Sequence, residues 1–217
     1  TAGRNVWIGR ESAIEGGIAA GRSLTVERDS SVQDLFAESS ISLDAGVRVQ
    51  GRVLANGSAN AGQGLDLTGD WTGASVHFDR DARVTGDVTA ASGRISMDRN
   101  ARITGDVRGN NDIWIDRDSA VSGDARPGLG KRLSVGRNVT IGGSTAPASV
   151  TADTFSLTEP GPAPTPGAAG SQSIWEGRSS STTLDPGAYG TVGFGSNATL
   201  NLAAGRYTMR SFWMDAD

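Results

Sequence analysis

A repeat of apolar residues runs through most of this chain and constrains its fold more than any other feature. In each frame an anchor residue follows another apolar residue by two positions, and further apolar residues stand six and ten positions after the anchor. In one frame Met97 is the anchor, and Ile95, Ile103 and Val107 fill the other three positions. Residues two apart point to the same side of a strand, and branched aliphatics favour strands, so this spacing predicts short β-strands.

Seven frames share the pattern, with anchors 17 to 20 residues apart except across one gap of 35. The anchors are Ile8, Val26, Leu43, Phe78, Met97, Ile115 and Val135. The gap leaves room for one degenerate turn, to which we assign Leu65, Leu67 and Trp71. The last position of the second frame falls on Phe36, and that of the seventh falls on Thr145. Such units cannot bury their own apolar side, so they must stack; this predicts an all-β parallel β-solenoid with coils of about 17–20 residues.

Glycine marks a corner eight residues after the anchor in six of the seven frames, and Asp34 stands there in the other. Three of these corners read Gly86-Asp87, Gly105-Asp106 and Gly123-Asp124. Glycine permits a positive φ there, and the aspartates are expected to line up along one edge of the solenoid. Their periodic repetition favours a structural ladder over a catalytic site, which needs carboxylates in differing environments.

Arginine stands two residues after the anchor in six frames, usually between acidic residues. These arginines are Arg10, Arg28, Arg80, Arg99, Arg117 and Arg137. Stacked guanidinium groups repel one another, so we expect an exposed ladder of mixed charge in which each arginine meets carboxylates of its own coil and the next. Exposed ion pairs of this kind contribute about 0–1 kcal/mol each.

The acidic residues beside these arginines are the candidates for binding Ca²⁺, which prefers several oxygen ligands. They are Asp79, Asp81, Asp98, Asp116 and Asp118. The neighbouring arginines already neutralise them, and the glycine-rich calcium-binding nonapeptide is missing. We therefore expect no metal or cofactor to be required.

Composition excludes several classes of function. The chain has 217 residues, no cysteine and one histidine, so disulfides, thiol nucleophiles and mechanisms with two imidazoles are excluded. Its net charge of −4 argues against a general nucleic-acid binder. The sequence contains no run of 18 apolar residues, so it predicts no membrane span. We expect a protein that is not an enzyme.

Three segments, 83–88, 102–107 and 120–125, read Arg-Val-Thr-Gly-Asp-Val, Arg-Ile-Thr-Gly-Asp-Val and Ala-Val-Ser-Gly-Asp-Ala. In these motifs, and in spacing over about residues 4–145, the chain resembles the bactofilins, a family of bacterial polymer-forming proteins. The resemblance implies a right-handed parallel β-helix that assembles head to tail into filaments without nucleotide. It also implies a cytoplasmic, cytoskeletal location.

The repeat and the composition divide the chain into three segments. Residues 1–158 are the predicted solenoid, and residues 159–170 are a proline-rich linker or surface loop. Residues 171–217 resume the apolar spacing, and we expect further β-coils there, stacked on the first block or forming a small second one.

Self-association is the function that the open repeat pattern favours. Val6 and Ile8 already open a frame with no helical cap before them, and Phe212, Trp213 and Met214 resemble the start of another frame. Unpaired strand edges are templates for pairing with another chain, and a contact between unlike ends propagates into a filament. We therefore expect these five residues to lie at contacts between copies, in a filament or cell-surface scaffold.

Two tryptophans, Trp7 and Trp114, occupy the outward position between two apolar strand residues. An exposed tryptophan can anchor a protein contact or stack on a sugar ring. This supports an alternative, a secreted β-helix that binds or cleaves carbohydrate, and a surface glycan is the corresponding partner. A third interpretation is the stalk of an adhesin. The exposed tryptophans and the linker favour the cell envelope or the exterior.

Overall fold

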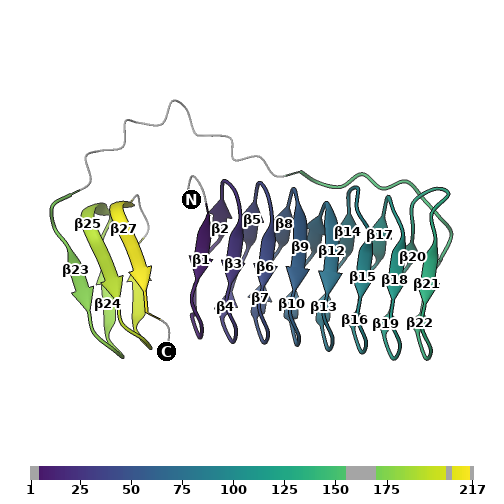
Figure 1. Ribbon diagram of the computed structural model, residues 1–217, viewed down its shortest axis with the longest axis horizontal. Coiled ribbons are helices and arrows are strands. Elements are labelled where there is room, and N and C mark those ends of the chain that lie inside the picture. Colours follow the sequence, from purple (N-terminus) through teal and green to yellow (C-terminus); the bar gives the residue numbers. More distant parts are fainter. Residues whose placement is uncertain (1–4, 155–169, 204–206, 216–217) are drawn as a thin grey trace. The chain divides into compact units, whose positions relative to one another are not determined.

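The computed structural model describes residues 5–154, 170–203 and 207–215, and the chain divides into two compact units, Thr1–Leu157 and Thr158–Asp217 (Figure 1). The described residues form strands, turns and bends, and the fold is an all-β parallel β-solenoid, as the sequence predicts. Within those ranges no helix is long and apolar enough to cross a membrane.

Three parallel sheets run along the first unit, and each coil contributes one short strand to each sheet, except that the first coil has no strand in the second sheet and the eighth has none in the third. The first sheet contains, in spatial order, β1 (Val6–Ile8), β3 (Leu24–Val26), β6 (Ile41–Leu43), β9 (Ser58–Ala61), β12 (Ser75–Phe78), β15 (Ile95–Met97), β18 (Ile113–Ile115) and β21 (Leu133–Val135). The second contains β4 (Ser31–Val32), β7 (Arg48–Gln50), β10 (Asp66–Thr68), β13 (Arg83–Thr85), β16 (Arg102–Ile103), β19 (Ala120–Val121) and β22 (Thr140–Ile141). The third contains β2 (Ile18–Ala20), β5 (Leu35–Ala37), β8 (Val53–Ala55), β11 (Trp71–Gly73), β14 (Val88–Ala90), β17 (Val107–Gly109) and β20 (Ala125–Arg126). We number the coils 1 to 8 by the strands of the first sheet.

The register of the strands confirms the predicted columns. Ile95 pairs with Ile113, and Ile113 pairs with Leu133, so the residue two before each anchor stacks on its equivalent in the next coil. Met97 likewise lies between Phe78 and Ile115. These side chains are buried except toward the two ends of the unit, and together they form one continuous core.

The predicted degenerate turn is coil 4, and its packing explains why its frame is hard to see. Ala59 and Ala61 occupy the positions that branched aliphatics or larger residues fill in most other coils. Trp71, on the third sheet, is fully buried and lies 5.1 Å from Phe78, centroid to centroid. One large side chain thus fills the space that two small ones leave, which keeps the core close-packed.

Two positions of the predicted frames are wrong. Leu35 pairs with Ile18 and Val53 and is buried, whereas the predicted Phe36 points outward, with the Arg52 guanidinium 5.7 Å from its ring centroid. The corner of coil 2 is one residue shorter than the pattern assumes. Thr145 is exposed and lies outside any strand, because the chain leaves the solenoid after β22.

The second unit has longer strands than the first. One of its sheets contains β23 (Ile174–Glu176), β25 (Gly187–Phe194) and β27 (Tyr207–Met214), and the other contains β24 (Ser181–Leu184) and β26 (Thr199–Leu202). All of these strands pair in parallel, as expected for further coils. Leu184, Val192 and Phe194 form a separate small core. The proline-rich segment predicted at 159–170 lies, apart from Gly170, outside the described residues.

Candidate functional site

The Gly-Asp corner is a ladder of hydrogen bonds between coils. The Oδ1 atom of Asp70 accepts the backbone N–H of Asp87 at 2.9 Å, and Asp87 accepts that of Asp106 at 2.8 Å. Asp106 and then Asp124 continue the series, accepting the N–H groups of Asp124 and Ser144 at 2.6 Å each. The aspartates line up along one edge as predicted, and they satisfy backbone donors at a corner between strands.

The glycines before these aspartates leave room for the next coil. A Cβ added to Gly105 would lie 2.4 Å from the carbonyl oxygen of Gly86, and one on Gly123 would lie 2.8 Å from that of Gly105. Gly86 itself has a φ of 156°. Glycine is therefore required at Gly105 and Gly123 by the close stacking of backbone on backbone, and at Gly86 by its positive φ as well.

The arginine corner owes its acidic residues to backbone conformation. The residue three positions after the anchor has a left-handed φ between 55° and 72° in all eight coils, and in six of them it follows an arginine. These residues are Glu11, Asp29, Gly46, Gly64, Asp81, Asn100, Asp118 and Asn138. Apart from glycine, Asn and Asp tolerate this conformation best because their short polar side chains bond locally.

The carboxylates at this corner bind amide groups. Asp79 and Asp116 each accept the backbone N–H of the following arginine at 2.7 Å. Asp81 accepts the side-chain amide of Asn100 at 2.7 Å and that of Gln63 at 3.0 Å. Hydrogen bonds from Asn100 and Gln63, in that order, hold the pKa of Asp81 below its ordinary value, with a smaller contribution from the neighbouring arginines.

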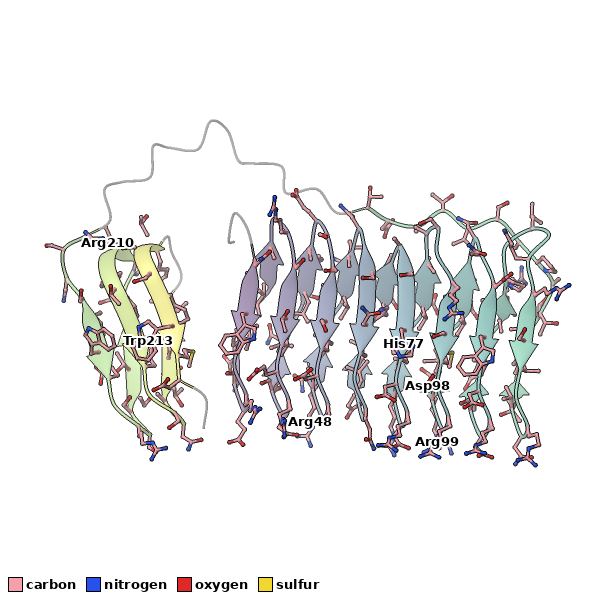
Figure 2. The ribbon with its side chains drawn as sticks, viewed as in Figure 1. Arg48, His77, Asp98, Arg99, Arg210 and Trp213 are labelled. Carbon is pink, nitrogen blue, oxygen red and sulfur yellow. The ribbon has the colours of Figure 1, made fainter. Side chains whose placement is uncertain are left out.

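The arginines of the predicted ladder are all exposed at one corner, where Figure 2 shows Arg99. Among the described residues, Arg10 pairs with Glu27 at 3.6 Å, and the other five ladder arginines have no carboxylate within 4.0 Å. We expected ion pairs between neighbouring coils. For most of the ladder, the carboxylates instead accept hydrogen bonds from amide groups. Ion pairs also form within the third sheet, between Arg126 and Asp124 at 2.8 Å and between Arg108 and Asp106.

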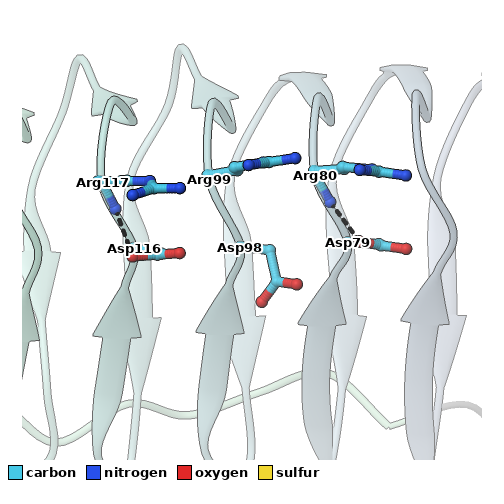
Figure 3. Close-up of a pocket in the computed structure, with 6 residues that line it drawn as sticks. All are labelled: Asp79, Arg80, Asp98, Arg99, Asp116 and Arg117. Carbon is cyan, nitrogen blue, oxygen red and sulfur yellow. Dashed lines mark hydrogen bonds between the residues drawn. The ribbon is translucent and has the colours of Figure 1, made fainter.

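Two adjoining grooves lie along this corner. The first, of about 350 Å³, is lined by an arginine and an aspartate from each of three successive coils (Figure 3). The second, of about 340 Å³, shares two arginines with the first and extends to coil 8. The lining residues are Asp79, Arg80, Asp98, Arg99, Asp116, Arg117, Asp118, Arg137 and Asn138.

The five aspartates considered for Ca²⁺ all lie at this corner. Within the described ranges, no three or more acidic or histidine side chains converge as ligands of a metal ion would. Asp118 accepts the side-chain amide of Asn138 at 3.0 Å, in the same way that Asp81 is held.

The outward tryptophans share one column of the first sheet. Trp7 pairs with Thr25, and Trp114 lies between Ser96 and Ser134. Trp7 is 57% exposed and Trp114 41% exposed, as the alternation of the strands predicts.

The second unit repeats this outward column, a feature that we did not predict from sequence. Trp175 and Trp213 occupy the equivalent position on either side of Gly193, and their rings meet edge to face with centroids 4.8 Å apart. A Cβ on Gly193 would lie 2.7 Å from the Trp213 ring, so glycine makes room for this contact. The signal in the sequence is a tryptophan placed between two strand residues, Ile174 and Glu176.

The predicted self-association residues lie on strands with a single neighbour in the described part of the chain. Val6 and Ile8 belong to β1, which pairs with β3 alone, and Phe212, Trp213 and Met214 belong to β27, which pairs with β25 alone. A second exposed edge, which we did not predict, is β21 of coil 8, where Val135 is 52% exposed.

These features define the class of the molecule as a parallel β-solenoid of about 11 coils, eight in the first unit and three in the second. No protein-family model, no curated protein sequence and no solved structure matches the chain. The parallel β-solenoid that the resemblance to bactofilins implies is present, and no family is assigned.

Proposed function

We propose that this protein is a structural, non-enzymatic scaffold that assembles into filaments by stacking its end coils. The observation that carries the proposal is a difference in burial between paired residues in one column of the core. Ile115 is fully buried, whereas Val135, its partner in the next strand, is 52% exposed. Apolar side chains that would be inside a longer solenoid thus lie open at the edge of this one.

The geometry of a parallel solenoid makes such edges complementary. β1 and β21 are the two ends of the same eight-stranded sheet, so a copy moved along the axis can place its first strand on the last strand of its neighbour in the same register. The contact joins unlike edges and therefore propagates. It buries apolar side chains and pairs the free peptide groups of both edges.

The carboxylates of the Gly-Asp ladder support a structural role rather than catalysis. Asp106 and Asp124 have matching surroundings, since each accepts a backbone N–H of the next coil and pairs with the arginine two residues ahead. General acid–base chemistry needs carboxylates whose environments separate their pKa values.

We also propose a location at the cell surface, which the exposed tryptophans support.

The test is sedimentation velocity of the full chain over a concentration series, with one charge introduced at each edge. Ile8 is buried in the core, so the charge on β1 is placed at the half-buried Val6: Val6→Asp should abolish assembly, and either Phe212→Asp or Val135→Asp should do the same, which identifies the edge that receives β1. Thr104→Asp, on an exposed lateral position, is the matched control and should assemble like the unmodified chain. A monomer at all concentrations, or assembly unaffected by all three edge variants, would overturn the proposal.

A further inference from the structure

Among the described residues, four arginines without a carboxylate partner form a row at one corner of coils 5 to 8. They are Arg80, Arg99, Arg117 and Arg137. Figure 3 shows the first three side by side and extended in the same direction. Because adjacent strands of a sheet are about 4.8 Å apart, the row presents one guanidinium group at each such interval.

These guanidinium groups retain their donors for a ligand. Within the described residues, none of the four has a carboxylate within 4.0 Å, in contrast to Arg10, which reaches Glu27. Asp79 and Asp116, which precede Arg80 and Arg117, accept backbone N–H groups. Four like charges in a row repel one another, and a ligand with regularly spaced anionic groups would relieve that repulsion.

A second row, of carboxylates, runs beside the arginines. Asp79, Asp98 and Asp116 line the same groove, one from each of three coils. An ionised carboxylate only accepts hydrogen bonds, and a guanidinium only donates them. The groove therefore presents a row of donors next to a row of acceptors, both repeating with the coil.

We propose that this groove binds an acidic polysaccharide of the polyuronate class, lying along the solenoid axis. Each uronate ring carries one carboxylate, which an arginine can bind in bidentate geometry, and hydroxyls, which can donate to the aspartate row. The arginines and aspartates repeat with the coil, about 4.8 Å apart, so a glycan lying along the groove meets a carboxylate-binding group and a hydroxyl-binding group at each interval. A polyphosphate offers only acceptors, so it leaves the aspartate row without donors, whereas the hydroxyls of a polyuronate supply them; the paired rows therefore favour the glycan.

The experiment measures binding of polygalacturonate to the full chain by calorimetry, with neutral dextran as the ligand control. The variant Arg99→Gln/Arg117→Gln removes two central arginines of the row and should weaken binding at least tenfold. Arg22→Gln/Arg48→Gln changes the net charge equally at exposed positions outside the row and should change the affinity less than twofold. Binding should weaken steadily with added salt, as contacts to a polyanion do.

Equal losses in the two double variants would overturn the proposal, as would absence of binding at low salt or tighter binding of polyphosphate than of polygalacturonate. Thermal unfolding of each variant checks that the fold is intact. The inference is independent of end stacking, because the groove lies on the side of the solenoid. Arg99→Gln/Arg117→Gln should sediment like the unmodified chain, so failure of one proposal leaves the other standing.

Discussion

The Oδ1 atom of Asp87 accepts the backbone N–H of Asp106 across 2.8 Å, from one coil to the next. The contact recurs along the Gly-Asp corner, where the chain turns between the second and third sheets. An unpaired peptide donor at such a turn costs free energy comparable to a lost hydrogen bond. The repeated aspartate thus extends the pairing of the sheets around a corner that has no strand.

Replacing a carboxylate of this ladder should destabilise the solenoid according to the acceptor that remains. Asp106→Ala removes the acceptor of the Asp124 N–H, and we expect the free energy of unfolding to fall by about 1–3 kcal/mol. Asp106→Asn keeps a side-chain oxygen and should cost less. Urea denaturation of the two variants measures the difference, and equal losses would show that charge, rather than the hydrogen bond, carries the effect.

Glycine at the same corner should be intolerant of a methyl group. In Gly105→Ala the new Cβ would meet the Asp87 carboxylate and lie 2.4 Å from the Gly86 oxygen, so neighbouring coils must separate. We expect a loss of about 2–4 kcal/mol, as for overpacking of a buried site. Gly9→Ala is the control, since no atom lies within 4 Å of its added Cβ. The prediction fails if both substitutions shift the unfolding midpoint equally.

Stability should depend on which residue type occupies the left-handed positions at the arginine corner. Asp118 has a φ of 62°, so Asp118→Val should destabilise the protein by about 1–2 kcal/mol more than Asp118→Gly. Both variants lose the bond from Asn138, so their difference isolates the backbone term. Thermal or urea unfolding tests this, and a valine variant as stable as the glycine variant would contradict the assignment.

Stability should depend on the charge of Asp81 in acid. The pKa of Asp81 is lowered in the folded protein, so its ionised form favours folding. This contribution to stability is fully present above the unfolded-state pKa near 3.8. It is lost as the pH falls through the lower pKa of the folded protein. Asp81→Asn, which tolerates the same φ of 64°, lacks this dependence. The stability difference between the two proteins should therefore be constant above about pH 5 and shrink below pH 4. A difference that persists unchanged into acid would contradict the prediction.

The columns of the core are visible in the sequence because each coil repeats the same inward positions. Coil 2 shows where this reasoning fails, since Leu35 and Phe36 are both apolar and spacing alone chooses the wrong one. The choice depends on a shorter corner, in which the Arg52 N–H bonds to Asp34 at 2.7 Å. A deletion of one residue in a turn leaves no mark on the hydrophobic pattern.

The arginine corner was found from the sequence, but its pairing was not. Whether Asp79 meets a guanidinium or a backbone N–H depends on competition between local donors, which residue spacing does not resolve. Trp175 escaped notice because its neighbour Glu176 occupies the anchor position. Every other coil has an apolar residue there, and all of these except Ala61 are larger than alanine. The polar anchor hid the frame to which the tryptophan belongs.

X-ray diffraction from oriented assemblies of the full chain tests the central claim most directly, because it reports both the stacked coils and their direction. If filaments form by continuing the solenoid, strands lie across the filament, and a reflection near about 4.8 Å should appear along the filament axis. A reflection of that spacing perpendicular to the axis, or a chain that forms no filaments, would contradict the account.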